Sequence, residues 1–380
     1  MTVEQGSLAR ADAALSAPAV AALGLPTVRP WPETRVSDAE WERILAEART
    51  HRLTGLLHWA AWTGIIPVTD GQAEAAAEAH LGPAAHVVRL EQDLLTVTTL
   101  LEHERVPHLV MKGPAVARLD YPDPEMRTFV DIDVLVPGPL VTEAVATLGL
   151  AGFERRVPSL RATFDRRFAK SVTLRSDEGL EIDLHRTIVD GPAARAIPTS
   201  DVWSQPEPVR VGPRVLDAPS WDVRLLHAAF AVAVADNPPR LSCMRDLAQM
   251  LLSPVVQPAR LLDRADTWGA RPVLARAVSR TWRALDLRQD TIPWWADSTG
   301  FPPTQPPPPS GDWEQWFGLY DSARGSFPAL ADATLRHLPW PERASFLACV
   351  ALPRRDYLRH RGMGRLAYLR RGVTRMDDPT

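Results

Sequence analysis

Two aspartates separated by a single residue are the most chemically informative pair in this sequence. The stretch FVDIDVLV places carboxylates at Asp131 and Asp133 among apolar residues. Side chains two residues apart in a strand share one face, so both carboxylates point the same way while Val130, Ile132 and Val134 face the core. Mutual repulsion and desolvation make such a pair costly unless a cation neutralises it. Mg²⁺ accepts one or two carboxylates beside phosphate oxygens, so the pair predicts a metal site.

A second alternating stretch, LEIDLH, supplies further candidates. It predicts a neighbouring strand with Glu181, Asp183 and His185 on one face. A third carboxylate would complete a two-metal site or activate an attacking hydroxyl, and we assign Asp183 to it. His185 has three open roles: a base, a phosphate contact or the partner of a carboxylate. Glu181 is a weaker candidate, because it would also fit a position past the sheet edge.

Upstream of the aspartates, the residues Lys112, Gly113 and Pro114 follow an expected strand and open an expected helix. Glycine allows close approach of the backbone to a ligand, and a helix N-terminus favours phosphate. The chain has only two lysines, which draws attention to Lys112 as a phosphate contact, with a solvated helix start as the alternative. Arg127 either clamps a triphosphate oxygen or pairs with one of the two nearby aspartates, Asp131 or Asp133.

The hydrophobic periodicity indicates an α+β protein with a small mixed β-sheet core between N- and C-terminal helical regions. We expect a helical region over 1–105, an α/β core over 106–220, and a helical region over 221–380 with a proline-rich linker at 302–309. The predicted strands are 107–111, 129–136, 153–157, 171–175 and 180–184. The predicted helices are 37–57, 84–104, 114–119, 140–148, 221–235, 241–252, 258–268, 271–285, 313–323, 340–351 and 357–371.

Composition excludes several classes of protein. With 45% hydrophobic and 23% charged residues, the chain can bury a core and is not a disordered protein. Its net charge of −3 gives no global attraction for nucleic acid or anionic membranes. Cys243 and Cys349 cannot form a disulfide framework, and the N-terminus lacks the pattern of a signal peptide. We therefore expect a cytoplasmic protein.

These motifs together resemble the nucleotidyltransferases of the DNA polymerase β-like superfamily, and within it a bacterial nucleotidyltransferase group. The residues that carry the resemblance are Lys112-Gly113, Tyr121-Pro122-Asp123, Arg127, Asp131-Ile132-Asp133 and Asp183-Leu184-His185. The resemblance implies transfer of a nucleoside monophosphate from an NTP such as ATP, with release of pyrophosphate. It also implies Mg²⁺ or Mn²⁺ on Asp131, Asp133 and Asp183, and nucleotide contacts from Lys112, Gly113, Arg127 and His185.

The chain departs from the wider superfamily at the phosphate loop. Lys112-Gly113 stands where that superfamily carries Gly-Ser or Gly-Gly, so the serine contact to phosphate is absent. Either Lys112 replaces this contact or the nucleotide is held differently.

Downstream, we expect His227 and Asp246 to support the helical layer.

The acceptor is open to three interpretations. We favour a small molecule or peptide of a specialised-metabolite pathway. The second is a toxin- or antitoxin-type enzyme acting on tRNA or protein hydroxyls, which the acidic net charge disfavours. The third is a non-catalytic module that binds a nucleotide or peptide. Oligomeric state is not predicted.

Arginine-rich segments flank the expected sheet and the C-terminus. Six cations, Arg155, Arg156, Arg161, Arg166, Arg167 and Lys170, surround a predicted hairpin. They would suit an anionic acceptor or the triphosphate tail. The stretch 354–375 contains further arginines, for which a solvated helix face is a better interpretation than an RNA-binding surface. Its Gly362-Met363-Gly364 is too short to indicate nucleotide binding.

Overall fold

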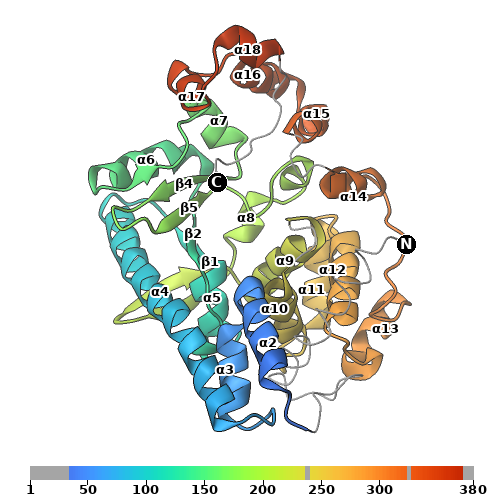
Figure 1. The fold of residues 1–380 in the computed structure, drawn as a ribbon. Helices are drawn as coiled ribbons and strands as arrows, with labels where there is room; N and C mark the ends of the chain where they lie inside the picture. Colours follow the sequence, from blue (N-terminus) through green and yellow to red (C-terminus); the bar gives the residue numbers. More distant parts are fainter. Residues whose placement is uncertain (1–33, 236–239, 323–326, 371–380) are drawn as a thin grey trace. The chain divides into compact units, whose positions relative to one another are not determined.

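The computed structural model describes residues 34–235, 240–322 and 327–370. Figure 1 shows its helices and strands. The chain forms two compact units: the first contains 1–91, 112–130 and 221–309, and the second contains 92–111, 131–220 and 310–380. The expectation about a signal peptide and the start of the expected helical region over 1–105 fall on 1–33, outside the described residues, as does the end of the arginine-rich stretch 354–375.

A five-stranded mixed sheet lies in the second unit, in the order β1-β2-β5-β4-β3 (Figure 1). Its strands are β1 (Leu109–Met111), β2 (Asp131–Leu135), β3 (Glu154–Arg155), β4 (Ser171–Arg175) and β5 (Glu181–His185). β2 and β5 are parallel, and the other neighbouring pairs are antiparallel. The predicted α+β class with a small mixed sheet is confirmed.

Apolar residues on alternate positions bury one face of the two central strands. Ile132, Val134, Ile182 and Leu184 are all 0% exposed. The expectation for Val130 was wrong, because this side chain is 41% exposed. Val130 precedes the first strand residue and so is not held on the core face.

Helices and a second, two-stranded sheet complete the second unit. Its helices are the end of α4 (Asp70–His103), η2 (Gly138–Leu140), α6 (Val141–Leu150), α7 (Ala162–Arg167), η3 (Pro192–Arg195), α8 (Thr199–Val202), α14 (Trp313–Ser322), α15 (Phe327–His337), α16 (Trp340–Ala351), α17 (Arg355–His360) and α18 (Arg365–Arg370). The hairpin of β6 (Glu207–Val211) and β7 (Arg214–Ala218) was not predicted. Its turn contains Gly212, whose φ of 53° suits glycine.

The elements of the first unit within the described residues are helices, joined by turns and irregular segments. Its helices are α2 (Asp38–His51), α3 (Thr54–Trp62), the start of α4, α5 (Lys112–Leu119), η1 (Pro124–Met126), α9 (Trp221–Phe230), the π-helical η4 (Ala231–Ala235), α10 (Leu241–Leu251), α11 (Pro258–Thr267), α12 (Arg271–Ala284), η5 (Gln289–Thr291) and α13 (Pro293–Thr299). Ser37 caps α2 by accepting a hydrogen bond from the Glu40 amide at 3.3 Å.

Three expected helices have other boundaries in the structure. The helix expected over 37–57 is divided into α2 and α3 at Arg52, which has a φ of 58°. Helix α4 begins at Asp70 rather than 84 and continues through Pro83. Thr69 and Gln72 form a reciprocal cap at its start, with amide-to-side-chain distances of 3.2 and 3.1 Å. The single helix expected over 357–371 is instead α17 and α18, separated at Gly362, where φ is 61°.

None of the described helices combines the length and the apolar character needed to cross a bilayer.

Candidate active site

The parallel pairing of β2 and β5 sets the position of the acidic residues in the second unit. Asp133 lies directly opposite Asp183, and Asp131 lies opposite Glu181. Directly paired residues project from the same face of a sheet, so the alternation that buries Ile132 and Ile182 sends Asp133 and Asp183 to the other face. The sheet thus brings together carboxylates from two separate segments.

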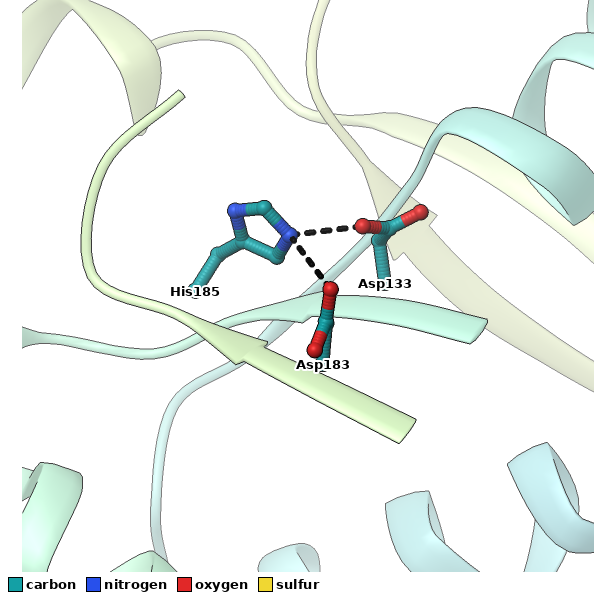
Figure 2. A group of neighbouring side chains, drawn as sticks. All are labelled: Asp133, Asp183 and His185. Carbon is teal, nitrogen blue, oxygen red and sulfur yellow. Dashed lines mark hydrogen bonds and ion pairs between the residues drawn. The ribbon is translucent and has the colours of Figure 1, made fainter. Parts of the chain in front are cut away.

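Three side chains converge on this face, and we call Asp133, Asp183 and His185 the sheet cluster (Figure 2). One ligand atom from each lies within 4.8 Å of the others. The Nε2 atom of His185 is 2.6 Å from Asp133 Oδ1 and 4.0 Å from Asp183 Oδ2. His185 is fully buried and the Asp133 side chain is 1% exposed, whereas that of Asp183 is 24% exposed. The cluster is therefore accessible from the Asp183 side.

The ring of His185 is held between two acceptors. Its Nδ1 atom lies 3.2 Å from the carbonyl oxygen of Thr187, opposite the Asp133 contact of Nε2. A carbonyl and a carboxylate accept hydrogen bonds, so both ring nitrogens of His185 lie beside acceptors that fix the orientation of the ring. Among the three roles open for His185, the geometry favours the partner of a carboxylate, because the ring orients Asp133.

Thr173 on β4 holds Asp183, the remaining member of the sheet cluster, in place. Its hydroxyl donates to Asp183 Oδ1 at 2.5 Å, and Thr173 and Asp183 are directly paired across β4 and β5. One oxygen of Asp183 is thus tethered while Oδ2 faces His185. Sequence reasoning missed Thr173, although the alternation in SVTLR already placed Ser171 and Thr173 on one face of a predicted strand.

The donor set suits a hard divalent cation. Mg²⁺ and Mn²⁺ prefer carboxylate oxygens, and the sheet cluster offers them from two strands. Two adjacent carboxylates also repel each other, and bound cations relieve that repulsion. The chemistry of the residues therefore fits the divalent metal that the sequence predicted.

Asp131 and Glu181 lie one pair further along the same strands. Neither belongs to the three-residue group that converges within 4.8 Å among the described residues. Glu181 is engaged by Arg156 at 3.1 Å and by Arg175 at 2.9 Å. The arginine contacts give Glu181 a structural role.

Lys112 and Gly113 directly follow β1, whose last residue, Met111, pairs with Asp133. The helix starts at Lys112 itself, and this residue has a φ of 42°, a left-handed conformation that costs a non-glycine residue free energy. At Gly113, a Cβ atom would approach the Phe129 ring to 2.7 Å. Glycine is therefore required at this position by packing, independently of any nucleotide.

Arg127 is paired with an acidic residue far away in the sequence. Its Nε and Nη2 atoms donate to the two carboxylate oxygens of Asp246 at 2.8 and 2.7 Å. Tyr121 donates to the same carboxylate at 2.8 Å. We call Tyr121, Arg127 and Asp246 the arginine cluster; all three belong to the first unit. Of the two roles proposed for Arg127, the structure shows pairing with an aspartate, though not with Asp131 or Asp133.

Electrostatics hold the arginine cluster in one protonation state. Burial and the negative charge of Asp246 raise the pKa of Tyr121 well above its usual value, so its hydroxyl remains a donor. Burial opposes the charge on Arg127, but Asp246 offsets it and the pKa of the guanidinium is raised. Asp246 and His227 are 6% and 8% exposed within α10 and α9, as expected of residues that support the helical layer.

Comparisons with known proteins give a family. A family model described as an uncharacterised nucleotidyltransferase matches residues 37–283. No protein with a curated description matches the chain. Among solved structures, the solution structure of the antibiotic-resistance factor ANT(2'')-Ia shares 14% identity over 48% of this chain and 91% of its own, with a TM-score of 0.35.

Two further structures are similar. The lincomycin-bound crystal structure of the lincosamide antibiotic adenylyltransferase LnuA shares 16% identity over 42% of this chain and 94% of its own, with a TM-score of 0.30. An antigenic nucleotidyltransferase-like protein from Paracoccidioides brasiliensis shares 17% identity over 55% of this chain and 95% of its own, with a TM-score of 0.33. The family match extends over more than half of the chain and contains the whole sheet cluster, so the protein belongs to the uncharacterised nucleotidyltransferase family.

Proposed function

We propose that the protein is a metal-dependent enzyme that transfers a nucleoside monophosphate from an NTP to an acceptor. The observation that carries this proposal is the sheet cluster, in which Asp133 and Asp183 face each other across parallel strands with His185 at 2.6 Å from Asp133. Membership of a nucleotidyltransferase family supports the reaction class.

Each residue has a proposed role. Asp131, Asp133 and Asp183 would hold Mg²⁺ or Mn²⁺, which when bound neutralises charge on the NTP phosphates. His185 orients Asp133 through its 2.6 Å contact. Lys112 and Gly113 would contact the phosphates, since they follow the residue that pairs with Asp133. Arg127 would support nucleotide binding only indirectly, because its guanidinium already donates to the carboxylate of Asp246.

The transfer step follows from these roles. An acceptor hydroxyl forms a bond to the α-phosphorus of the NTP, and the bond from that phosphorus to the bridging oxygen breaks. The electron pair leaves with pyrophosphate. Asp183 receives the hydroxyl proton, since it is the more exposed carboxylate of the sheet cluster. Positioning and charge stabilisation supply the catalysis, as in phosphoryl transfer generally.

We further propose a cytoplasmic enzyme whose NTP is ATP and whose acceptor is a small molecule or peptide of a specialised-metabolite pathway. The test incubates the protein with each α-³²P-labelled NTP, Mg²⁺ or Mn²⁺, and cell extract. We expect label to appear on one class of acceptor together with pyrophosphate, and to be absent with Asp133→Ala. Equal labelling by this variant would contradict the assigned site.

A further inference from the structure

A cavity of about 420 Å³ lies within the second unit, against strand β4. This volume falls in the range of sites for small molecules. Its walls come from β4, from the segment 155–170 that precedes β4, and from helices α15 to α18. We call it the β4 pocket.

The β4 pocket adjoins the sheet cluster. Ser171 and Thr173 line it, and they pair directly with His185 and Asp183 across β4 and β5. Thr173 also donates its hydroxyl hydrogen bond to Asp183. A molecule in contact with Thr173 therefore has only this residue between it and the carboxylate of Asp183, which we propose as the proton acceptor.

One wall of the pocket is aromatic. Phe168 meets Phe346 edge-on with ring centroids 5.1 Å apart, and Phe164 lies 6.0 Å from Phe346. Tyr357 and Tyr368, 6.4 Å apart, line it as well and belong to a buried apolar group with Leu160. Such a wall favours a flat or apolar ligand.

The other lining residues give the pocket a positive balance. Its lining cations are Arg155, Arg156, Lys170 and Arg361, against the two lining carboxylates of Asp165 and Asp190 and that of Glu181, which engages Arg156 at 3.1 Å. Asp165 is already engaged by Arg155 at 3.1 Å and by Ser159 at 2.6 Å. The backbone of Lys170 is fixed beside the end of β5, because its carbonyl accepts from the Arg186 amide at 2.8 Å.

We propose that the β4 pocket is the acceptor site, and that the acceptor is an aromatic or apolar molecule carrying an anionic group, such as a carboxylate, beside its reacting hydroxyl. This inference rests on the proposed function. In the transfer step, the acceptor oxygen bonds to the α-phosphorus, pyrophosphate leaves, and the proton passes to Asp183. A polycationic acceptor would meet the four lining cations and bind poorly.

A nucleotide is itself an aromatic anion, so it is the competing occupant. The sheet order argues against it. β1, which leads into Lys112 and Gly113, and β4, which lines the pocket, lie on opposite sides of β2 and β5. In-line displacement places the acceptor and the leaving pyrophosphate on opposite sides of the phosphorus. With the phosphates assigned to the β1 side, the β4 side is left for the acceptor.

The test uses three probes of one shape: 2-naphthylacetate, 2-(2-naphthyl)ethanol and 2-(2-naphthyl)ethylamine, with the full chain and calorimetry. We expect the anion to bind at least about tenfold more tightly than the cation. Lys170→Gln should reduce this preference, and Ala331→Trp should block all three probes by filling the cavity. Arg166→Gln is the matched control, because Arg166 is exposed and does not line the pocket.

Proximity to the sheet cluster is tested by ¹H NMR of the naphthylacetate probe with Mn²⁺. Its signals should broaden with the wild type and not with Asp183→Asn. Three results would each overturn the proposal. They are equal affinity of the protein for the anionic and the cationic probe, displacement of naphthylacetate by ATP with nothing else added, and bound Mn²⁺ that leaves the naphthylacetate signals unbroadened. Electron paramagnetic resonance measures Mn²⁺ binding separately, so failure of the metal site, and with it of the proposed function, is distinguished from failure of the pocket.

Discussion

The sheet cluster and the arginine cluster each take residues from the segment 121–133 and join them to residues far away in the sequence, yet they differ in charge balance. In the arginine cluster, the carboxylate of Asp246 receives two guanidinium bonds and a tyrosine hydroxyl. The sheet cluster instead gathers two carboxylates around one imidazole. Neighbours in sequence such as Arg127 and Asp133 thus belong to different kinds of site.

This difference in charge balance suits the arginine cluster to stabilising the fold and the sheet cluster to binding a cation. A carboxylate saturated by fixed donors has no lone pair directed at a ligand, and its main effect is to hold segments together. Paired carboxylates retain affinity for a cation, and natural proteins keep such a costly arrangement mostly where it has a function. We therefore expect substitutions in the sheet cluster to affect activity and those in the arginine cluster to affect stability.

The largest effect is expected for Asp133→Asn. Loss of this carboxylate should reduce nucleotidyl transfer by at least about a thousandfold, because the charge that holds the metal is removed. Asparagine keeps the shape, and its Oδ1 atom can still accept from the His185 ring, so the free energy of unfolding without metal should fall less than in Asp246→Asn. Mn²⁺ should raise the Tm of the wild type and not that of the variant. A variant that still gains stability from Mn²⁺ would show that Asp133 is not a ligand.

Asp246→Asn should mainly affect stability. It leaves the Arg127 guanidinium buried without its counter-charge, which costs about 3–5 kcal/mol in the free energy of unfolding. Denaturant unfolding measures this loss, and Mn²⁺ binding should persist in the protein that remains folded. The double variant Arg127→Met/Asp246→Leu should recover most of the stability. If it bound NTP much more weakly than the wild type, Arg127 would have a role at the nucleotide as well.

The sequence predicted the sheet cluster better than the arginine cluster, because the two clusters differ in how far apart their residues lie in the sequence. Alternation within a strand is local, so the common face of Asp183 and His185 could be predicted from six residues. Arg127 and Asp246 are 119 positions apart, and no local pattern links them. Thr173 depended on the pairing of β4 with β5, which alternation alone does not reveal.

Helix boundaries failed where a local signal conflicted with the surrounding structure. The helix expected over 84–104 begins instead at the Thr69 and Gln72 cap, a pattern present in the sequence, and α4 continues through Pro83. The β6–β7 hairpin was similarly available from the alternation around Gly212. The core strands, by contrast, were predicted to within two or three residues at each end.

A smaller effect is expected for Thr173→Val, which removes the hydrogen bond to Asp183 but keeps the shape of the side chain. Partners that orient a metal ligand are worth about ten- to a hundredfold in metal affinity. Mn²⁺ titration by electron paramagnetic resonance should therefore show a weakening of that size. Thr142→Val, at an exposed position, is the matched control. Unchanged Mn²⁺ affinity in Thr173→Val would restrict Thr173 to lining the β4 pocket.

The smallest effect concerns the backbone at Lys112. Glycine adopts a φ of 42° without the cost of about 1 kcal/mol that a side chain incurs there. If Lys112 serves the nucleotide, Lys112→Gly should keep at least the wild-type stability while the KM for NTP rises about tenfold, the loss of one charged phosphate contact. Arg105→Gly relieves a similar conformation, φ 57°, and should leave the KM unchanged. A clear loss of stability in Lys112→Gly, without one in Arg105→Gly, would instead give Lys112 a structural role like that of Arg127. Lys112 would then be grouped with the arginine cluster, which stabilises the fold, and not with the sheet cluster, which we assign to the chemistry.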